Sequence, residues 1–201
     1  MLIVTEFLTL DGVGQAPGRP DEDPSEGFQH GGWQAPLGDA DVGDVIFEQA
    51  RTMNALLLGR RTYEIFSNYW PSAPPQIPFT GLFNAVPKFV ASTTLSSPLE
   101  WANSTVISDD VPAAVRALKT QFAELHVIGS LHLAQTLLRH GLVDRLSIWT
   151  YPVVLGSGKR LFEGGALPST LRLVDAVTYP SGTIHARYDL ADTPRYASMA
   201  T

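Results

Sequence analysis

The stretch LHVIGSLHLAQTLLRHGLVDRLSIWTYPVV, Leu125–Val154, predicts a strand, a helix and a second strand in close succession. An apolar run over Leu125–Ile128 ends at a Gly-Ser pair, and leucine and alanine then recur at the 3.6-residue spacing of a helix. Gly141 is well placed to end that helix, and the apolar pattern resumes at Leu146. Before this unit strands alternate with helices, whereas after it strands follow one another almost without helices.

The whole chain therefore predicts an α/β fold. Further helices are expected over Asp41–Met53 and after the Asp110 cap, and further strands over Leu2–Leu8, Ala55–Leu58, Lys88–Ala91, Thr105–Ile107, Leu171–Val177 and Ile184–Leu190. We expect a mixed sheet of about eight strands flanked by helices, whose last section is an antiparallel meander. A single domain should cover 1–190, followed by a loosely ordered tail over 191–201.

Composition excludes several classes of function. The net charge is −6 and no run of Lys and Arg occurs, which argues against nucleic-acid binding. Because the chain has no cysteine, disulfides, thiolate metal sites and cysteine nucleophiles are excluded, and the five histidines lack metal-ligand spacing. We expect no metal, no membrane span and a cytoplasmic location, since neither a basic leader nor a run of about 20 apolar residues is found.

Three turns after predicted strands carry groups that suit phosphate. In LLLGRRTYE a buried strand ends at Gly59, and a helix is expected to start near Arg60, so its free N–H groups, Arg60, Arg61 and Thr62 could bind an anion. The same residues also fit an ordinary turn in which the arginines are solvated or paired with Glu64.

The other two turns are weaker alone. KFVASTT runs from a strand into Ser92, Thr93 and Thr94, and HVIGSL places Gly129 and Ser130 before a helix; both also fit plain turns. Together the three turns favour an extended ligand with phosphates, such as a dinucleotide. No G-x-G-x-x-G fingerprint follows the first strand.

Two long segments between predicted elements, 12–40 and 68–87, are expected to be functional lids or disordered loops. Phe28 and Trp33 in the first of them favour packing against another group, with a ligand as one candidate.

The order and spacing of TLDGVG, LLLGRRTYE, KFVAST and the segment Leu125–Phe162 resemble the dihydrofolate reductase-like family. That family includes the C-terminal reductase domain of the bifunctional riboflavin-biosynthesis deaminase-reductase, and the likeness is to a bacterial stand-alone branch of it. It runs over Met1–Leu190. The resemblance implies NADPH lying across the C-terminal ends of the central strands, a cytoplasmic enzyme and a homodimer formed through the late strands.

The resemblance also implies roles for particular residues. Val13 is expected beside the cofactor, and Trp33, in the segment His30–Trp33, beside the substrate. Asp44 lies closest to the acid that helps protonate the substrate in dihydrofolate reductases and is the expected catalytic residue, with Glu48 as a substrate contact; both acids also fit a solvated helix face. The expected phosphate contacts are Gly59, Arg60, Arg61 and Thr62, then Ser92, Thr93 and Thr94 at the ribose 2′-phosphate, and Gly129, Ser130 and Leu131 at the pyrophosphate.

We therefore expect an NADPH-dependent oxidoreductase that transfers hydride to a C=N or C=O carbon of a small heterocyclic or ribosylamine-type substrate. By resemblance, the model reaction is that of 5-amino-6-(5-phosphoribosylamino)uracil reductase. Two alternatives stay open. One is a non-enzymatic module that binds NADPH or senses a ligand, and the other is a phosphosugar-binding protein that uses the same turns.

Overall fold

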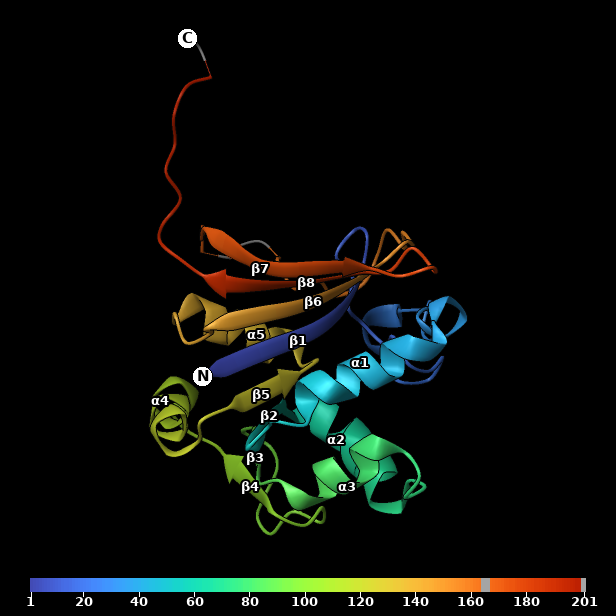
Figure 1. Ribbon diagram of the computed structural model, residues 1–201. Helices are drawn as coiled ribbons and strands as arrows, with labels where there is room; N and C mark the ends of the chain where they lie inside the picture. The colour runs from blue at the N-terminus through green and yellow to red at the C-terminus, as the bar shows by residue number, and fades with distance from the viewer. Residues whose placement is uncertain (164–166, 200–201) are drawn as a thin grey trace.

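The computed structural model describes residues 1–163 and 167–199 and is built around one eight-stranded sheet (Figure 1). The strands are β1 (Leu2–Thr9), β2 (Ala55–Gly59), β3 (Lys88–Ala91), β4 (Ser104–Ile107), β5 (Leu125–Ile128), β6 (Arg145–Tyr151), β7 (Leu171–Thr178) and β8 (Ile184–Leu190). Their order is β4-β3-β2-β5-β1-β6-β8-β7, and β8 alone runs against its neighbours. The predicted α/β fold with a mixed sheet is confirmed.

Helices cover both faces of this sheet. They are α1 (Ala40–Ala50), α2 (Arg60–Tyr69), α3 (Pro78–Ala85), α4 (Val111–Gln121) and α5 (Leu131–Arg139), and short 3₁₀ turns lie at Ser25–Gly27, Ala35–Leu37 and Trp70–Ser72. In Figure 1, α1 lies in front of the sheet and α5 behind it. The chain thus leaves β2 toward one face and β5 toward the other, which opens a crevice at the C-terminal ends of the strands.

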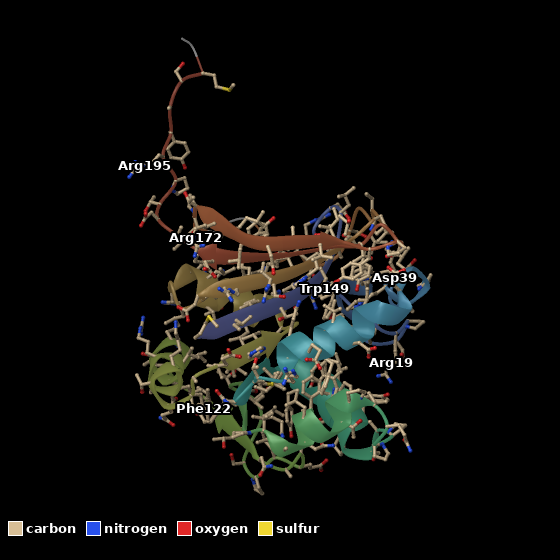
Figure 2. The ribbon with its side chains drawn as sticks, viewed as in Figure 1. Arg19, Asp39, Phe122, Trp149, Arg172 and Arg195 are labelled. Atoms are coloured by element: carbon tan, nitrogen blue, oxygen red, sulfur yellow. The ribbon has the colours of Figure 1, made fainter. Side chains whose placement is uncertain are left out.

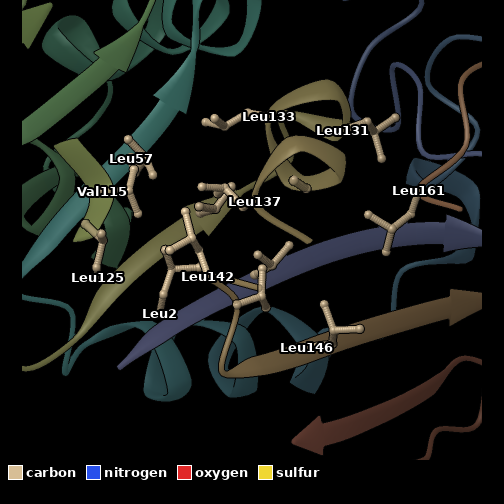
Figure 3. Close-up of a cluster of buried hydrophobic side chains, with 14 of the residues drawn as sticks. Leu2, Leu57, Val115, Leu125, Leu131, Leu133, Leu137, Leu142, Leu146 and Leu161 are labelled. Carbon is tan, nitrogen blue, oxygen red and sulfur yellow. The ribbon is translucent and has the colours of Figure 1, made fainter. Parts of the chain in front are cut away.

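The larger core lies between α5, α4 and the sheet. Figure 3 shows leucines of α5 directed at leucines of β1, β2 and β5, and Leu2, Leu57, Leu125 and Leu137 are fully buried. Full burial of each such side chain stabilises the fold by roughly 1.5–3 kcal/mol. The predicted cap of α4 is present, because an Asp110 carboxylate oxygen accepts a 2.9 Å hydrogen bond from the Ala113 N–H.

Two details of the predicted fold are wrong. The segment 68–87 is not a plain loop, since it contains α3, in which Pro78 occupies the first turn. The spacing of Phe79, Leu82 and Phe83 carried that helical pattern, and the surrounding prolines obscured it. The late strands do not form a meander, because β8 lies between β6 and β7.

The sheet ends with β8, and the following residues leave it. The Ala191 N–H still donates to the Thr170 carbonyl, and the chain then runs away from the sheet past Arg195 (Figures 1 and 2). The predicted tail extends over residues 200 and 201, which lie outside the described residues. No helix in the described part of the chain is both long and apolar enough to cross a membrane.

Candidate active site: a polar cleft that adjoins an apolar cavity

A polar cleft of about 790 Å³ lies at the C-terminal ends of β1, β2, β3 and β5. This volume is within the range of roughly 300–1,000 Å³ that is usual for ligand sites. The structure brings together here all ten residues predicted at the three turns: Gly59, Arg60, Arg61, Thr62, Ser92, Thr93, Thr94, Gly129, Ser130 and Leu131. The three turns thus form one site, as the dinucleotide hypothesis requires.

Two helices begin at this cleft, directly after buried strands. α2 follows Gly59, which has no side chain to cap the helix, and α5 follows Ser130, whose hydroxyl does not bind the N–H groups of α5. The Ser130 hydroxyl instead accepts a 3.0 Å hydrogen bond from the Gly59 N–H, which joins the two turns. The first-turn N–H groups of α2 and α5 therefore offer two neighbouring anion sites.

The turn before α5 is left-handed at two successive residues, with φ of +60° at Gly129 and +64° at Ser130. A Cβ added at Gly129 would meet nothing closer than Thr62, at 3.8 Å. The left-handed conformation, and not crowding within the protein, is therefore what favours glycine at this position.

The arginines of the cleft are paired with carboxylates. Arg60 donates to Glu64 at 2.9 Å, and Arg61 donates to Asp23 at 2.6 Å. Lys159 also binds Asp23, at 2.8 Å. Burial acts to raise the pKa of Asp23, but the hydrogen bonds from Lys159 and Ser25 and the charge of Lys159 outweigh it and hold that pKa below its usual value. Both predicted phosphate ligands thus also serve as internal ion-pair partners.

At the third turn the hydroxyls have different tasks. Ser92 is buried, and its Oγ accepts hydrogen bonds from the backbone N–H groups of Thr94 and Leu95. Thr93 and Thr94 are exposed and line the cleft. Ser92 therefore closes the turn, and the two threonines face the space where a ligand would lie.

The first long loop forms a wall of the cleft through residues 14–18, 22–23 and 25–26. Trp33 is packed inside it, with an edge contact to Tyr151 at 5.6 Å between ring centroids and a 2.8 Å hydrogen bond to the Gln15 carbonyl. Trp149 belongs to the same cluster and lies in the interior in Figure 2. Val13 is fully buried there. Trp33 and Val13 therefore line neither cavity, and Gly14 reaches the cleft instead.

A second, mainly apolar cavity of about 350 Å³ lies between α1 and the sheet. Ile46, Gln49 and Ala50 of α1 line it. Farther along, toward the N-terminal ends of the strands, it contains His126, whose pKa burial lowers, so that this imidazole is neutral at pH 7. The two cavities adjoin, because Phe7, Gln34, Phe66 and Ile128 line both. We call these four residues the junction.

Asp44 and Glu48 do not reach either cavity. Both lie on the exposed side of α1, where Glu48 pairs with Arg51. The residues that face the apolar cavity from this helix are uncharged. The geometry therefore gives no support to the catalytic role predicted for Asp44 or the substrate contact predicted for Glu48.

Sequence reasoning missed an acid on β1. Glu6 lines the cleft, is 1% exposed, and its Oε1 has no hydrogen-bond partner among the described residues. Burial raises the pKa of Glu6 to about 8, so this carboxyl is largely protonated at pH 7. A single acid in a strand of mainly apolar residues was the available signal. The other missed residues are Gln34, Asp23 and Lys159.

Comparisons with known proteins agree with this architecture. A protein from Bacillus subtilis (strain 168), described as uncharacterized protein YyaP, is 28% identical over 155 residues, which cover 75% of this chain and 80% of that protein. A pyrimidine reductase-like protein from Corynebacterium diphtheriae superposes with a TM-score of 0.65 at 15% identity, over 94% of this chain and 91% of that one. RibD from Acinetobacter baumannii superposes with a TM-score of 0.63 at 14% identity, over 94% of this chain and 57% of that one.

At these identities the two solved structures show a shared fold. The model of the RibD C-terminal domain family matches residues 1–185, a range that contains most of the sheet, the whole lining of the cleft and all of the apolar cavity's lining except Arg187. The chain belongs to the RibD C-terminal domain family.

Proposed function

We propose that the protein is an NADPH-dependent reductase that transfers hydride to a C=N or C=O carbon of a small heterocyclic or ribosylamine-type substrate. The observation that carries this proposal is the junction, where a polar cleft with two helix N-termini adjoins an apolar cavity. Hydride transfer needs a dinucleotide and a substrate in direct contact, and two adjoining sites of different polarity suit such a pair.

The residues of the cleft fit the cofactor. The first-turn N–H groups of α2 and α5 would hold its phosphates, and exposed Thr93 and Thr94 would lie beside the 2′-phosphate together with Arg60 or Arg61. When bound, NADPH supplies the hydride. The protein contributes orientation, and the wall formed by the first loop limits the access of water.

The apolar cavity would take the substrate. Phe7, Phe66 and Ile128 at the junction would pack against a flat ring, and Gln34 offers the only side-chain amide there. Gln34 Nε2 donates a 2.6 Å hydrogen bond to the Tyr151 hydroxyl, which fixes the amide and leaves its oxygen as an acceptor for a substrate N–H. The names of the relatives, RibD and pyrimidine reductase-like protein, favour a pyrimidine of the riboflavin pathway as this ring.

Binding of NADPH and NADH, followed by the fluorescence of the reduced nicotinamide, tests the proposal. We expect NADPH to bind more tightly than NADH, and the double variant Arg60→Ala, Arg61→Ala to lose that preference. Oxidation of NADPH should then occur with at least one member of a panel of pterins, pyrimidines and ribosylamines. Absence of NADPH binding would refute the proposal.

One observation favours a second candidate, an NADPH-binding module without a reaction. None of the four junction residues carries an ionisable side chain, and the ionisable residues of the apolar cavity lie away from the junction, like Glu124 and His126 near the start of β5. No junction residue can supply the proton that a reduction needs. Tight binding of NADPH that is never oxidised across the panel would support this candidate.

A further inference from the structure

Glu6 is a carboxyl group at a position that packing alone would assign to an apolar side chain. Its side chain points to the same face of β1 as those of Leu2, Val4 and Leu8, all of which are buried. A buried carboxyl without a hydrogen-bond partner is costly even when it is protonated. Stability does not explain this residue, which makes a function the better explanation.

The sheet is open beside Glu6. The pairing of β1 with β5 stops at Thr5 and Ile128, and the Gly129 N–H donates to the Thr5 carbonyl at 3.1 Å as the chain turns away. On its other side β1 continues to pair with β6, where Glu6 lies opposite Ile148. The side of Glu6 that has no neighbouring strand is therefore the side on which the cleft lies.

Glu6 lies at the end of the cleft where hydride would be exchanged. It precedes Phe7, a junction residue, and it lines the cleft together with Gly14 and Gly129. The predicted phosphate ligands Arg60 and Thr93 come from α2 and from the turn after β3, and β5 separates both of their strands from β1. A dinucleotide with its phosphates at those turns would bring its nicotinamide riboside half toward Glu6.

We propose that Glu6 contacts the bound dinucleotide as a neutral carboxylic acid and donates a hydrogen bond to an oxygen of the nicotinamide riboside half. This inference rests on the proposed function, since it requires NADPH in the cleft. Both the carboxamide and the ribose of that half present oxygen acceptors. An ionised carboxylate has no proton to donate and would repel the phosphates of the same ligand.

Binding of the cofactor is then linked to the protonation of Glu6. Burial raises the pKa of Glu6 to about 8, and bound NADPH raises it further, so NADPH affinity falls as the pH rises above about 8. The other charged and titratable groups that share the cleft do not contribute to the shift, for which burial is the cause. They are Glu22, Asp23 and Glu26 of the first loop, Arg60 and Arg61 of α2, Asp109, His132 of α5, and Lys159.

The direct test measures the dissociation constant of NADPH between pH 7.5 and 9.5. Over this range the 2′-phosphate stays ionised. We expect the affinity of the wild type to fall about ten-fold or more. Glu6→Gln, which keeps a neutral donor, should bind with little change over the same range. An equal pH dependence in Glu6→Gln and the wild type would overturn the inference.

Glu22 provides the matched control, because burial raises the pKa of this cleft carboxyl too. The Glu22 carboxylate accepts hydrogen bonds from the Gly18 and Arg19 N–H groups and is therefore already occupied. Glu22→Gln should retain the pH dependence of the wild type. Loss of the dependence in Glu22→Gln would assign it to the first loop and overturn the inference.

A second measurement uses only the wild type and is independent of the folding of any variant. The heat of NADPH binding at pH 8.5, recorded in two buffers with different ionisation enthalpies, gives the number of protons taken up. We expect uptake of between about half a proton and one proton. Binding without proton uptake overturns the role of Glu6 and leaves the proposed function intact, whereas absence of binding refutes the proposed function itself.

Discussion

The Asp23 carboxylate binds Arg61 Nη1 at 2.6 Å and, through its other oxygen, Lys159 Nζ at 2.8 Å. One buried acid of the first loop thus ties α2 to the segment that follows β6. The contact gives Arg61 a structural task besides any phosphate contact. It also explains why the first loop forms a wall of the cleft and not a free lid.

Asp23→Asn should destabilise the fold by about 1–3 kcal/mol, because two cations would lose their shared partner while partly buried. The loss should shrink as the pH falls: the pKa of Asp23 is depressed in the folded state, so its contribution is present above the unfolded pKa and is lost on acidification through the folded one. Urea unfolding at neutral and acid pH measures this. The control is Asp21→Asn, since Asp21 is exposed and its ion pair with Arg19 is long, at 3.9 Å. Equal effects of the two variants would contradict the prediction.

Arg60 is the better candidate for discrimination between NADPH and NADH. Its partner Glu64 lies one turn along the same exposed helix surface, an arrangement that contributes only a few tenths of a kcal/mol. A 2′-phosphate could therefore take over Arg60 more easily than Arg61. Arg60→Ala should weaken NADPH binding about ten-fold and leave NADH binding nearly unchanged.

Arg51→Ala is the matched control, because Arg51, the residue directly after α1, is also exposed, is also paired with a nearby glutamate, Glu48, and lines neither cavity. Fluorescence titration of both variants with both nucleotides measures the effect. If Arg61→Ala removed the preference for NADPH and Arg60→Ala did not, the assignment would be reversed.

A comparison of variants at Gly129 and Gly141 separates the effect of backbone strain from the effect of close ligand approach. Their φ angles are +60° and +62°, and neither would bring an added Cβ into close contact. Gly129→Ala and Gly141→Ala should each lose roughly 1–2 kcal/mol of stability. Only Gly129→Ala should also weaken NADPH binding, since Gly129 alone lines the cleft. Thermal melts and titrations test the pair, and equal binding by both variants would exclude close approach at Gly129.

The three turns were predictable because each is a local pattern. At two of them a buried strand, a glycine and an amphipathic helix lie within about fifteen consecutive positions, as at Leu125–Arg139. At the third, β3 runs directly into the hydroxyl residues Ser92, Thr93 and Thr94. That the turns meet at one cleft came from the family resemblance, whereas the order of the strands was not predicted. Missing α3 had a local cause as well, because prolines usually mark loops.

The residues that sequence reasoning misplaced depend on contacts between distant segments. Asp23 and Arg61 are 38 positions apart, and nothing near either residue announces the pair. The side of α1 that faces the sheet depends on how the helix is rotated, so Asp44 could be placed on the helix but not on a face. Glu6 was visible as an acid in a mainly apolar strand, but the lack of a neighbouring strand on one side of it depends on where β5 ends.

The homodimer stays a prediction, and the edge strand β7 is where we expect it. Leu173, Val174 and Val177 are exposed on this strand. An unprotected apolar edge favours association with a second copy of the chain. Light scattering should give a dimer for the wild type and a monomer for Val177→Glu. Tyr69→Glu, at an exposed apolar position on α2, should remain dimeric. A monomeric wild type at micromolar concentration would refute the prediction.

Replacement of Glu6 by leucine should stabilise the fold and weaken the binding of NADPH. The folded-state pKa of about 8 lies above the usual value for Glu, so the native state holds a proton that the unfolded state releases as the pH rises. The stability of the wild type therefore falls, relative to that of Glu6→Leu, as the pH rises from about 4.5 to 8. The free energy of unfolding of Glu6→Leu should exceed that of the wild type by at least about 1 kcal/mol more at pH 8 than at pH 5. Urea unfolding at the two pH values measures the difference. Glu6→Gln should show the same change with pH, because it too has no proton to release, and a gain independent of pH in both variants would show that the carboxyl is not held neutral in the native state.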